Sequence, residues 1–93
     1  MLLQQQTFYN TFKEAQMDLS NVTPGLRVKT TKLGDTIGML INEEHLYVRQ
    51  VDIIGTVTGY VPGHGGDVWW VKHDGGKAVG AYTYTEFEEH TEK

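Results

Sequence analysis

The stretch Gly65-Gly66-Asp67-Val68-Trp69-Trp70-Val71-Lys72-His73-Asp74-Gly75-Gly76 contains both tryptophans of the chain, between two glycine-rich turns. Its middle section, Asp67–His73, is predicted to be a β-strand. Successive side chains of a strand point to opposite faces, so only one of Trp69 and Trp70 can enter a given core. The other is expected to lie against solvent, another surface or a partner. The pair therefore suggests an aromatic binding surface in addition to a core residue.

All eleven glycines of the chain follow Pro24, and short β-type runs continue on the N-terminal side of the tryptophan strand. The expected strands are Leu26–Thr31, Thr36–Ile41, Leu46–Val51 and Ile53–Val61, with Asn42–His45 as the turn of a hairpin between the second and the third. Gly55 and Gly59 predict a bulge or sharp bend inside the last of these strands. Pro62–Gly66 then forbids a regular strand and predicts a loop.

The sequence after the tryptophans predicts a tight hairpin and a closing segment. Asp74-Gly75-Gly76 supplies residues that accept positive φ at the turn, and Ala78–Tyr84 is the returning strand. Thr85–Glu89 is predicted as a short helical turn capped by Thr85. Five or six short strands with glycine in their interiors predict a small barrel, because bulges have to introduce its curvature.

The first twenty residues differ from the rest in lacking glycine and proline. Apolar residues recur there at helical spacing, at Phe8, Phe12, Ala15 and Leu19. We expect a helix over residues 7–19 that packs on the barrel, with a partly ordered arm as the alternative. The chain is thus divided into an N-terminal helix or arm, residues 1–23, and a β-barrel domain, residues 24–93.

Length and composition exclude several classes of protein. The 93 residues suffice for a single domain, and the chain has no cysteine to form disulfides or thiolate metal sites. A formal net charge of −4 disfavours binding to nucleic-acid phosphates and is compatible with a basic protein partner. The N-terminus lacks the features of a signal peptide, and no apolar run reaches the ~18 residues of a membrane span. We therefore expect a cytoplasmic protein.

The order of turns and aromatic residues resembles the Src-homology-3-like barrel family. The resemblance covers roughly residues 24–90 and rests on Trp69-Trp70-Val71-Lys72, on the hairpin at Asp74-Gly75-Gly76, and on Gly80-Ala81-Tyr82 before a short helical turn. Pro24–Val28 is similar to the first strand of bacterial members, and Gly55–Tyr60 to a strand of the nucleic-acid-associated KOW-type barrels. The resemblance implies that Trp69 is the exposed groove residue and that Trp70 supports the sheet.

Two departures from that family concern its function. The acidic, tyrosine-bearing loop with which peptide-binding members grip polyproline is not recognisable, and Thr83 stands where a proline is expected. Polyproline recognition depends on a groove lined by several aromatic residues from those elements. The resemblance therefore implies the fold without implying polyproline binding.

The candidate partner-binding residues are aromatic and polar side chains of the last strands and their loops. They are Trp69, Tyr60, Tyr82, Tyr84, His64, Asp67 and Glu86. Exposed aromatic clusters bury a large area at low entropic cost and are typical of recognition hot spots. The alternative is that both tryptophans serve the core alone.

Catalytic and metal chemistry find no support in the sequence. No nucleophile–base pair and no phosphate-binding motif is present. His64, Asp67, His73 and Asp74 are better explained as solvated turn and strand residues than as a metal site. No cofactor is implied. We expect a non-enzymatic protein-binding module that acts through an aromatic and acidic surface, with Glu86 as one of its acidic residues. There are two alternatives: a phage-encoded inhibitor or nucleic-acid mimic that blocks a host defence nuclease, and a KOW-like nucleic-acid-binding barrel.

Overall fold

The computed structural model describes residues 19–91, and this part of the chain is mainly β. Its strands are β1 (Arg27–Thr30), β2 (Ile54–Tyr60), β3 (Val68–His73), β4 (Val79–Thr83) and β5 (Phe87–Glu89). The helical elements are the short helix α2 (Glu44–Tyr47) and the 3-10 turns η1 (Leu19–Asn21) and η2 (Tyr84–Glu86). The helix expected over residues 7–19 lies outside the described residues, except for Leu19.

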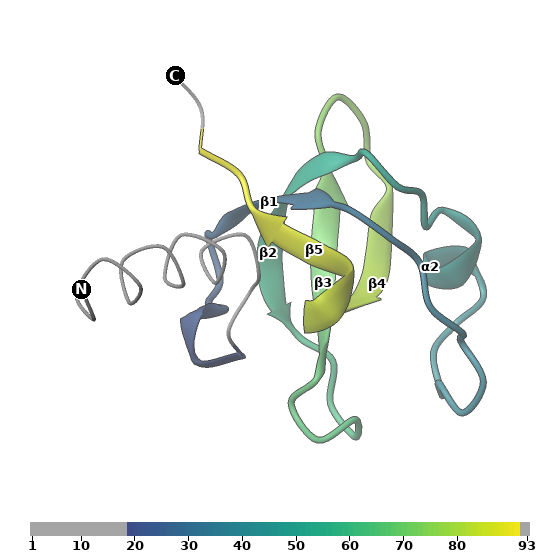
Figure 1. Ribbon diagram of the computed structural model, residues 1–93. Helices are drawn as coiled ribbons and strands as arrows, with labels where there is room; N and C mark the ends of the chain where they lie inside the picture. The colour runs from purple at the N-terminus through teal and green to yellow at the C-terminus, as the bar shows by residue number, and fades with distance from the viewer. Residues whose placement is uncertain (1–18, 92–93) are drawn as a thin grey trace, which may run out of the picture.

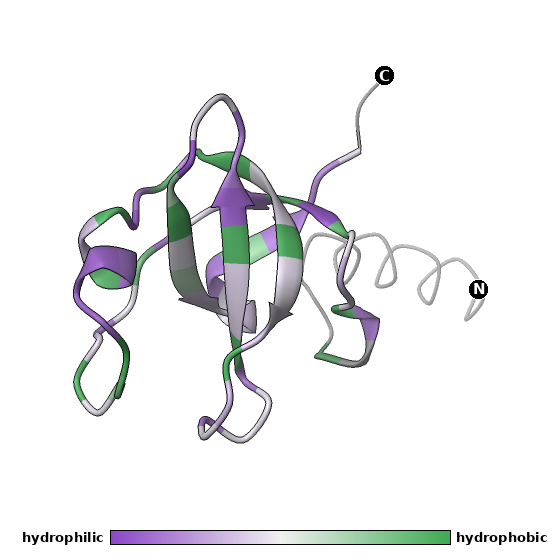
Figure 2. Cartoon of the chain, turned by 180° about the vertical axis from the view of Figure 1, so that it is seen from behind, coloured by the Kyte–Doolittle hydropathy of each residue, from purple (hydrophilic) through white to green (hydrophobic). Residues whose placement is uncertain are grey.

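The five strands form one antiparallel sheet in the order β4-β3-β2-β1-β5. The sheet curls over itself, so that β1 and β5 cross in front of β2, β3 and β4 in Figure 1 and behind them in Figure 2. It is not closed into a barrel, because β4 and β5 are its two edges and do not pair. The mainly β prediction is confirmed, whereas the closed barrel is not observed.

The concave side of the curled sheet encloses the main core. Its buried residues are Val22, Val28, Val57, Val71, Tyr82 and Phe87. Strand alternation directs β1 residues into this core, since every second residue of β1 is buried, at Val28 and Thr30. β2 and β3 approach closely at Gly55, where a Cβ atom would lie 2.4 Å from the carbonyl oxygen of Lys72. Only glycine fits at this close approach without a shift of the backbone.

The predicted irregularity in β2 is present. The register with β3 shifts between Val57, which pairs with Val71, and Gly59, which pairs with Trp70. Thr58 is therefore the additional residue of a β-bulge. The bulge reverses the alternation, so that Tyr60 stands opposite Trp69. Without it, Tyr60 would point to the other face of the sheet from Val57.

The β1–β2 connection (residues 31–53) corrects the sequence prediction most. Neither Thr36–Ile41 nor Leu46–Val51 is a strand. The residues predicted as the hairpin turn between them, Asn42–His45, lead into α2 instead. The apolar residues of these runs cover the outer face of the sheet. Met39, Ile41 and Leu46 pack there, beside Trp70, on a second cluster of buried residues formed by Val61, Val68 and Ala81. Alternating apolar residues were thus compatible with a strand and with a packed loop.

The segment after β4 also differs from the expectation. The helical turn begins at Tyr84 rather than after Thr85, and Phe87–Glu89 forms β5 instead of continuing the turn. The cap residue is Thr83, whose backbone N–H donates to Glu86 Oε1 at 2.9 Å. The turn starts earlier because Glu86 reaches back to this N–H and satisfies it.

Candidate functional site

Three of the predicted site residues form a row across the sheet. Tyr60 on β2 pairs with Trp69 on β3, which pairs in turn with Tyr82 on β4, so all three side chains share one face. Tyr82 is fully buried in the main core, whereas Tyr60 is 59% exposed. The rings of Tyr60 and Trp69 meet edge to face with centroids 6.1 Å apart. The row therefore runs from the core to solvent.

The two tryptophans point to opposite faces, as strand geometry predicts. Trp69 packs against the main core, and Trp70 packs against the second cluster with its ring 4.8 Å from that of His45. Both are half-buried. The division into a core Trp70 and an exposed Trp69 is thus corrected, because the β1–β2 connection covers one face and the curled sheet the other. The buried Nε1 of Trp69 has no hydrogen-bond partner among the described residues.

Tyr84 and Asp67 lie next to this row. Tyr84 is half-buried against the main core, as Trp69 is. Its backbone N–H donates to the carbonyl of Asp67 at 2.9 Å, which joins the start of η2 to the loop between β2 and β3. Asp67 itself is exposed. We refer to Tyr60, Trp69, Tyr84 and Asp67 together as the aromatic surface.

His64 connects two loops. Its Nδ1 lies 3.1 Å from the carbonyl oxygen of Pro62, and its Nε2 accepts the backbone N–H of Leu40 at 3.2 Å. Since the carbonyl can only accept, both bonds together require the neutral tautomer protonated at Nδ1. The ring is half-buried. The structure thus gives His64 an internal role between the predicted Pro62–Gly66 loop and the β1–β2 connection.

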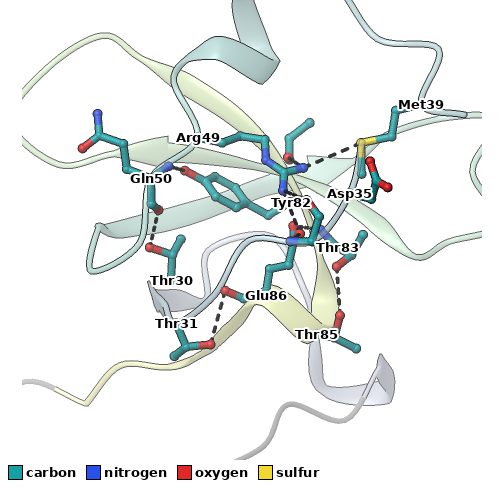
Figure 3. Close-up of polar contacts among 12 residues, drawn as sticks. Thr30, Thr31, Asp35, Met39, Arg49, Gln50, Tyr82, Thr83, Thr85 and Glu86 are labelled. Carbon is teal, nitrogen blue, oxygen red and sulfur yellow. Dashed lines mark hydrogen bonds and ion pairs between the residues drawn. The ribbon is translucent and has the colours of Figure 1, made fainter. Parts of the chain in front are cut away.

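Glu86 is an interior residue, which corrects its assignment to an acidic surface. Its Oε2 lies 2.7 Å from Arg49 Nη2, and both side chains are 3% exposed. Figure 3 shows the guanidinium of Arg49 beside this carboxylate. The same carboxylate accepts the backbone N–H of Gly34, so it ties η2 to the β1–β2 connection. The buried cation makes a buried carboxylate tolerable, since an unpaired one would be strongly penalised. The sequence carried no signal for Arg49.

Tyr82 also belongs to this interior polar group. Its hydroxyl accepts the backbone N–H of Gln50 at 3.1 Å and is hydrogen-bonded to His73 Nε2 at 2.9 Å. The guanidinium carbon of Arg49 lies 5.5 Å from the centre of the Tyr82 ring. Burial raises the pKa of the Tyr82 hydroxyl and lowers the pKa of His73. Tyr82 therefore supports the aromatic row from inside and does not reach the surface.

No three His, Asp or Glu side chains among residues 19–91 are placed to hold a metal ion. None of the helices in this part of the chain is both long enough and apolar enough to cross a membrane.

Comparisons of the chain with protein-family models, with curated proteins and with solved structures gave no match. The geometry of the described residues is therefore what carries a proposal about function.

Proposed function

We propose that this protein is a non-enzymatic protein-binding module that contacts its partner through the aromatic surface. The observation that carries the proposal is Tyr60, a large side chain that is 59% exposed and rests edge-on against Trp69. The bulge at Thr58 places it there. Because Trp69 is itself packed on the main core, the exposed ring has a fixed support.

A supported aromatic ring is suited to protein recognition for two reasons. Tyrosine buries a large area while losing few rotamers, and a ring that is already positioned loses less entropy on binding. The formal charge of −4 favours a protein over a nucleic acid as partner. Burial of Glu86 in an ion pair removes one of the carboxylates on which mimicry of a nucleic acid would depend.

Two tyrosine substitutions test the proposal. Affinity purification from the native host with the tagged wild-type protein provides a partner, whose affinity is then measured by calorimetry. Tyr60→Ser should weaken binding by about 2 kcal/mol, as expected for a hot spot, and leave the melting temperature nearly unchanged. Tyr47→Ser is the matched control, because Tyr47 is equally apolar, highly exposed and located on α2. An affinity that Tyr60→Ser does not change would refute the proposal.

A further inference from the structure

The β1–β2 connection exposes an unusual amount of apolar side chain. Five of the six large hydrophobic residues that are exposed in the described chain belong to it: Leu33, Ile37, Leu40, Tyr47 and Val51. Ile37 is 86% exposed and Leu40 is 90% exposed. The two most exposed of these residues, Ile37 and Leu40, lie in the loop Thr36–Ile41 beside α2, and Figure 2 shows much of that segment in green.

This loop is anchored at several points. Met39 and Ile41 point inward and pack on the second cluster. A turn brings the N–H of Met39 to the carbonyl of Thr36 at 3.1 Å, with Gly38 at a φ of +87°. That positive φ is readily adopted by glycine, and the turn leaves Ile37 at its outer corner.

The backbones of the two exposed residues are held as well. The N–H of Ile37 donates to Asp35 Oδ1 at 3.3 Å, and the N–H of Leu40 donates to His64 Nε2 at 3.2 Å. The side chains of Ile37 and Leu40 are therefore exposed to solvent on a backbone held by hydrogen bonds, although neither side chain contributes to a core. A fixed pair of this kind loses little conformational entropy when a partner covers it.

Carboxylates surround the apolar pair along the chain. Asp35 lies two residues before Ile37, and Glu43 and Glu44 lie at the start of α2, three and four residues after Leu40; all three carboxylates are exposed. The connection has fewer exposed cations than exposed carboxylates. Lys32 is exposed, whereas Arg49 is buried in its ion pair with Glu86. A complementary partner would offer an apolar contact between positive charges. A second copy of this chain would bring carboxylates of its own, which repel the carboxylates beside the loop. An anionic membrane would repel the same carboxylates.

We propose that the loop Thr36–Ile41 is a second docking element, in which Ile37 and Leu40 insert into a protein segment that carries Lys or Arg next to apolar residues. This inference is independent of the aromatic surface, because Trp69 and Tyr84 pack on the main core, whereas the loop packs on the second cluster at the opposite face of the sheet. Its failure would leave the proposed function untouched.

A random-peptide library displayed on phage is the probe, selected on the wild-type protein. We expect enriched peptides in which Lys or Arg flank apolar residues, with affinities measured by fluorescence anisotropy. The double variant Ile37→Ser/Leu40→Ser should lower the affinity at least about tenfold, whereas Val51→Ser and Tyr60→Ser should preserve it. Glu43→Gln/Glu44→Gln should weaken binding and reduce its dependence on salt.

Several results would overturn the proposal. They are the absence of enriched peptides, enriched peptides without basic residues, and equal affinity for the wild type and the double variant. Sedimentation of the wild type as a dimer that the double variant abolishes would assign the loop to a second copy instead. Co-sedimentation with phosphatidylcholine vesicles, lost in the double variant, would assign it to a lipid surface.

Discussion

The sheet and the β1–β2 connection are stabilised by different kinds of interaction. The sheet buries apolar residues fully, and Val28, Val57 and Val71 have no exposed surface. In the connection, Arg49 is the one buried residue, while Met39, Ile41 and Leu46 are only partly covered. Polar contacts from its side chains hold it to β4, through His45 Nδ1 on the carbonyl of Val79 at 2.8 Å and Arg49 on the carbonyl of Ala81 at 3.4 Å.

This difference indicates which region opens at the lower free energy and which region a single substitution can destabilise. Apolar burial is distributed over many residues, whereas the connection depends on one ion pair and a few hydrogen bonds. Segments with few buried apolar contacts open at lower free energy than the core. The connection is therefore expected to exchange its amide protons faster than β2 and β3 through transient openings, while its hydrogen bonds hold the docking loop in one conformation between them.

The largest expected effect comes from the buried ion pair. Glu86→Gln leaves Arg49 charged and without its carboxylate in the interior, which should lower the free energy of unfolding by about 3–5 kcal/mol. Urea denaturation measures this loss, with Glu89→Gln on the exposed end of β5 as the control. The double variant Arg49→Met/Glu86→Leu should regain much of the stability, since apolar replacement of both partners removes the unpaired charge. Equal stability of Glu86→Gln and Glu89→Gln would contradict the importance of the pair.

Substitution of the two neighbouring tryptophans tests whether the sheet and the connection lose stability separately. Each Trp→Ala change should cost about 3 kcal/mol, the low end for large aromatic residues, because both side chains are half-buried. Trp69→Ala should lower the protection of amides throughout β2, β3 and β4, since Trp69 packs on the main core. Trp70→Ala should act first on amides of residues 39–46, which share the second cluster with it.

Hydrogen exchange measured by mass spectrometry distinguishes these patterns. If both variants lose protection in the same segments, the sheet and the connection unfold as one unit and the comparison between them fails.

The smallest expected effect is a dependence of stability on pH through His73. Burial lowers its pKa below the usual value near 6.5, so the folded protein resists protonation of this ring more than the unfolded chain does. Its contribution to stability is therefore complete above that value and declines as the pH falls through it. His73→Gln should show a shallower loss of unfolding free energy between about pH 7.5 and 5.5. The other histidines are common to both proteins, so parallel curves would exclude His73 as a source of the dependence.

The parts of the fold that could be predicted from sequence are those with local causes. β2, β3 and β4 lie within a residue or two of the expected runs, because strand alternation and glycine-rich turns act between near neighbours. Gly75 has the positive φ expected of its turn, and the bulge in β2 lies beside Gly59. The pairing of Tyr60 with Trp69 follows from that bulge.

The remaining features depend on residues that are distant in sequence. Arg49 and Glu86 are separated by 37 positions, and no local pattern shows that a buried cation will meet a carboxylate assigned to an acidic surface. Thr36–Ile41 and Leu46–Val51 have strand-like alternation, but β1 is already paired with β2 and β5. These runs therefore pack their apolar residues on the outer face of the sheet.

The sequence by itself determined that the chain is mainly β, where its glycine turns fall, and that Trp69 and Trp70 face opposite sides of one strand. Tertiary structure alone decided that both tryptophans are half-buried, that Tyr82 and Glu86 are internal, and that Tyr60, Ile37 and Leu40 are exposed. The physical reason is that side-chain direction follows from the backbone of a few residues. Exposure depends instead on what the rest of the chain places on each face.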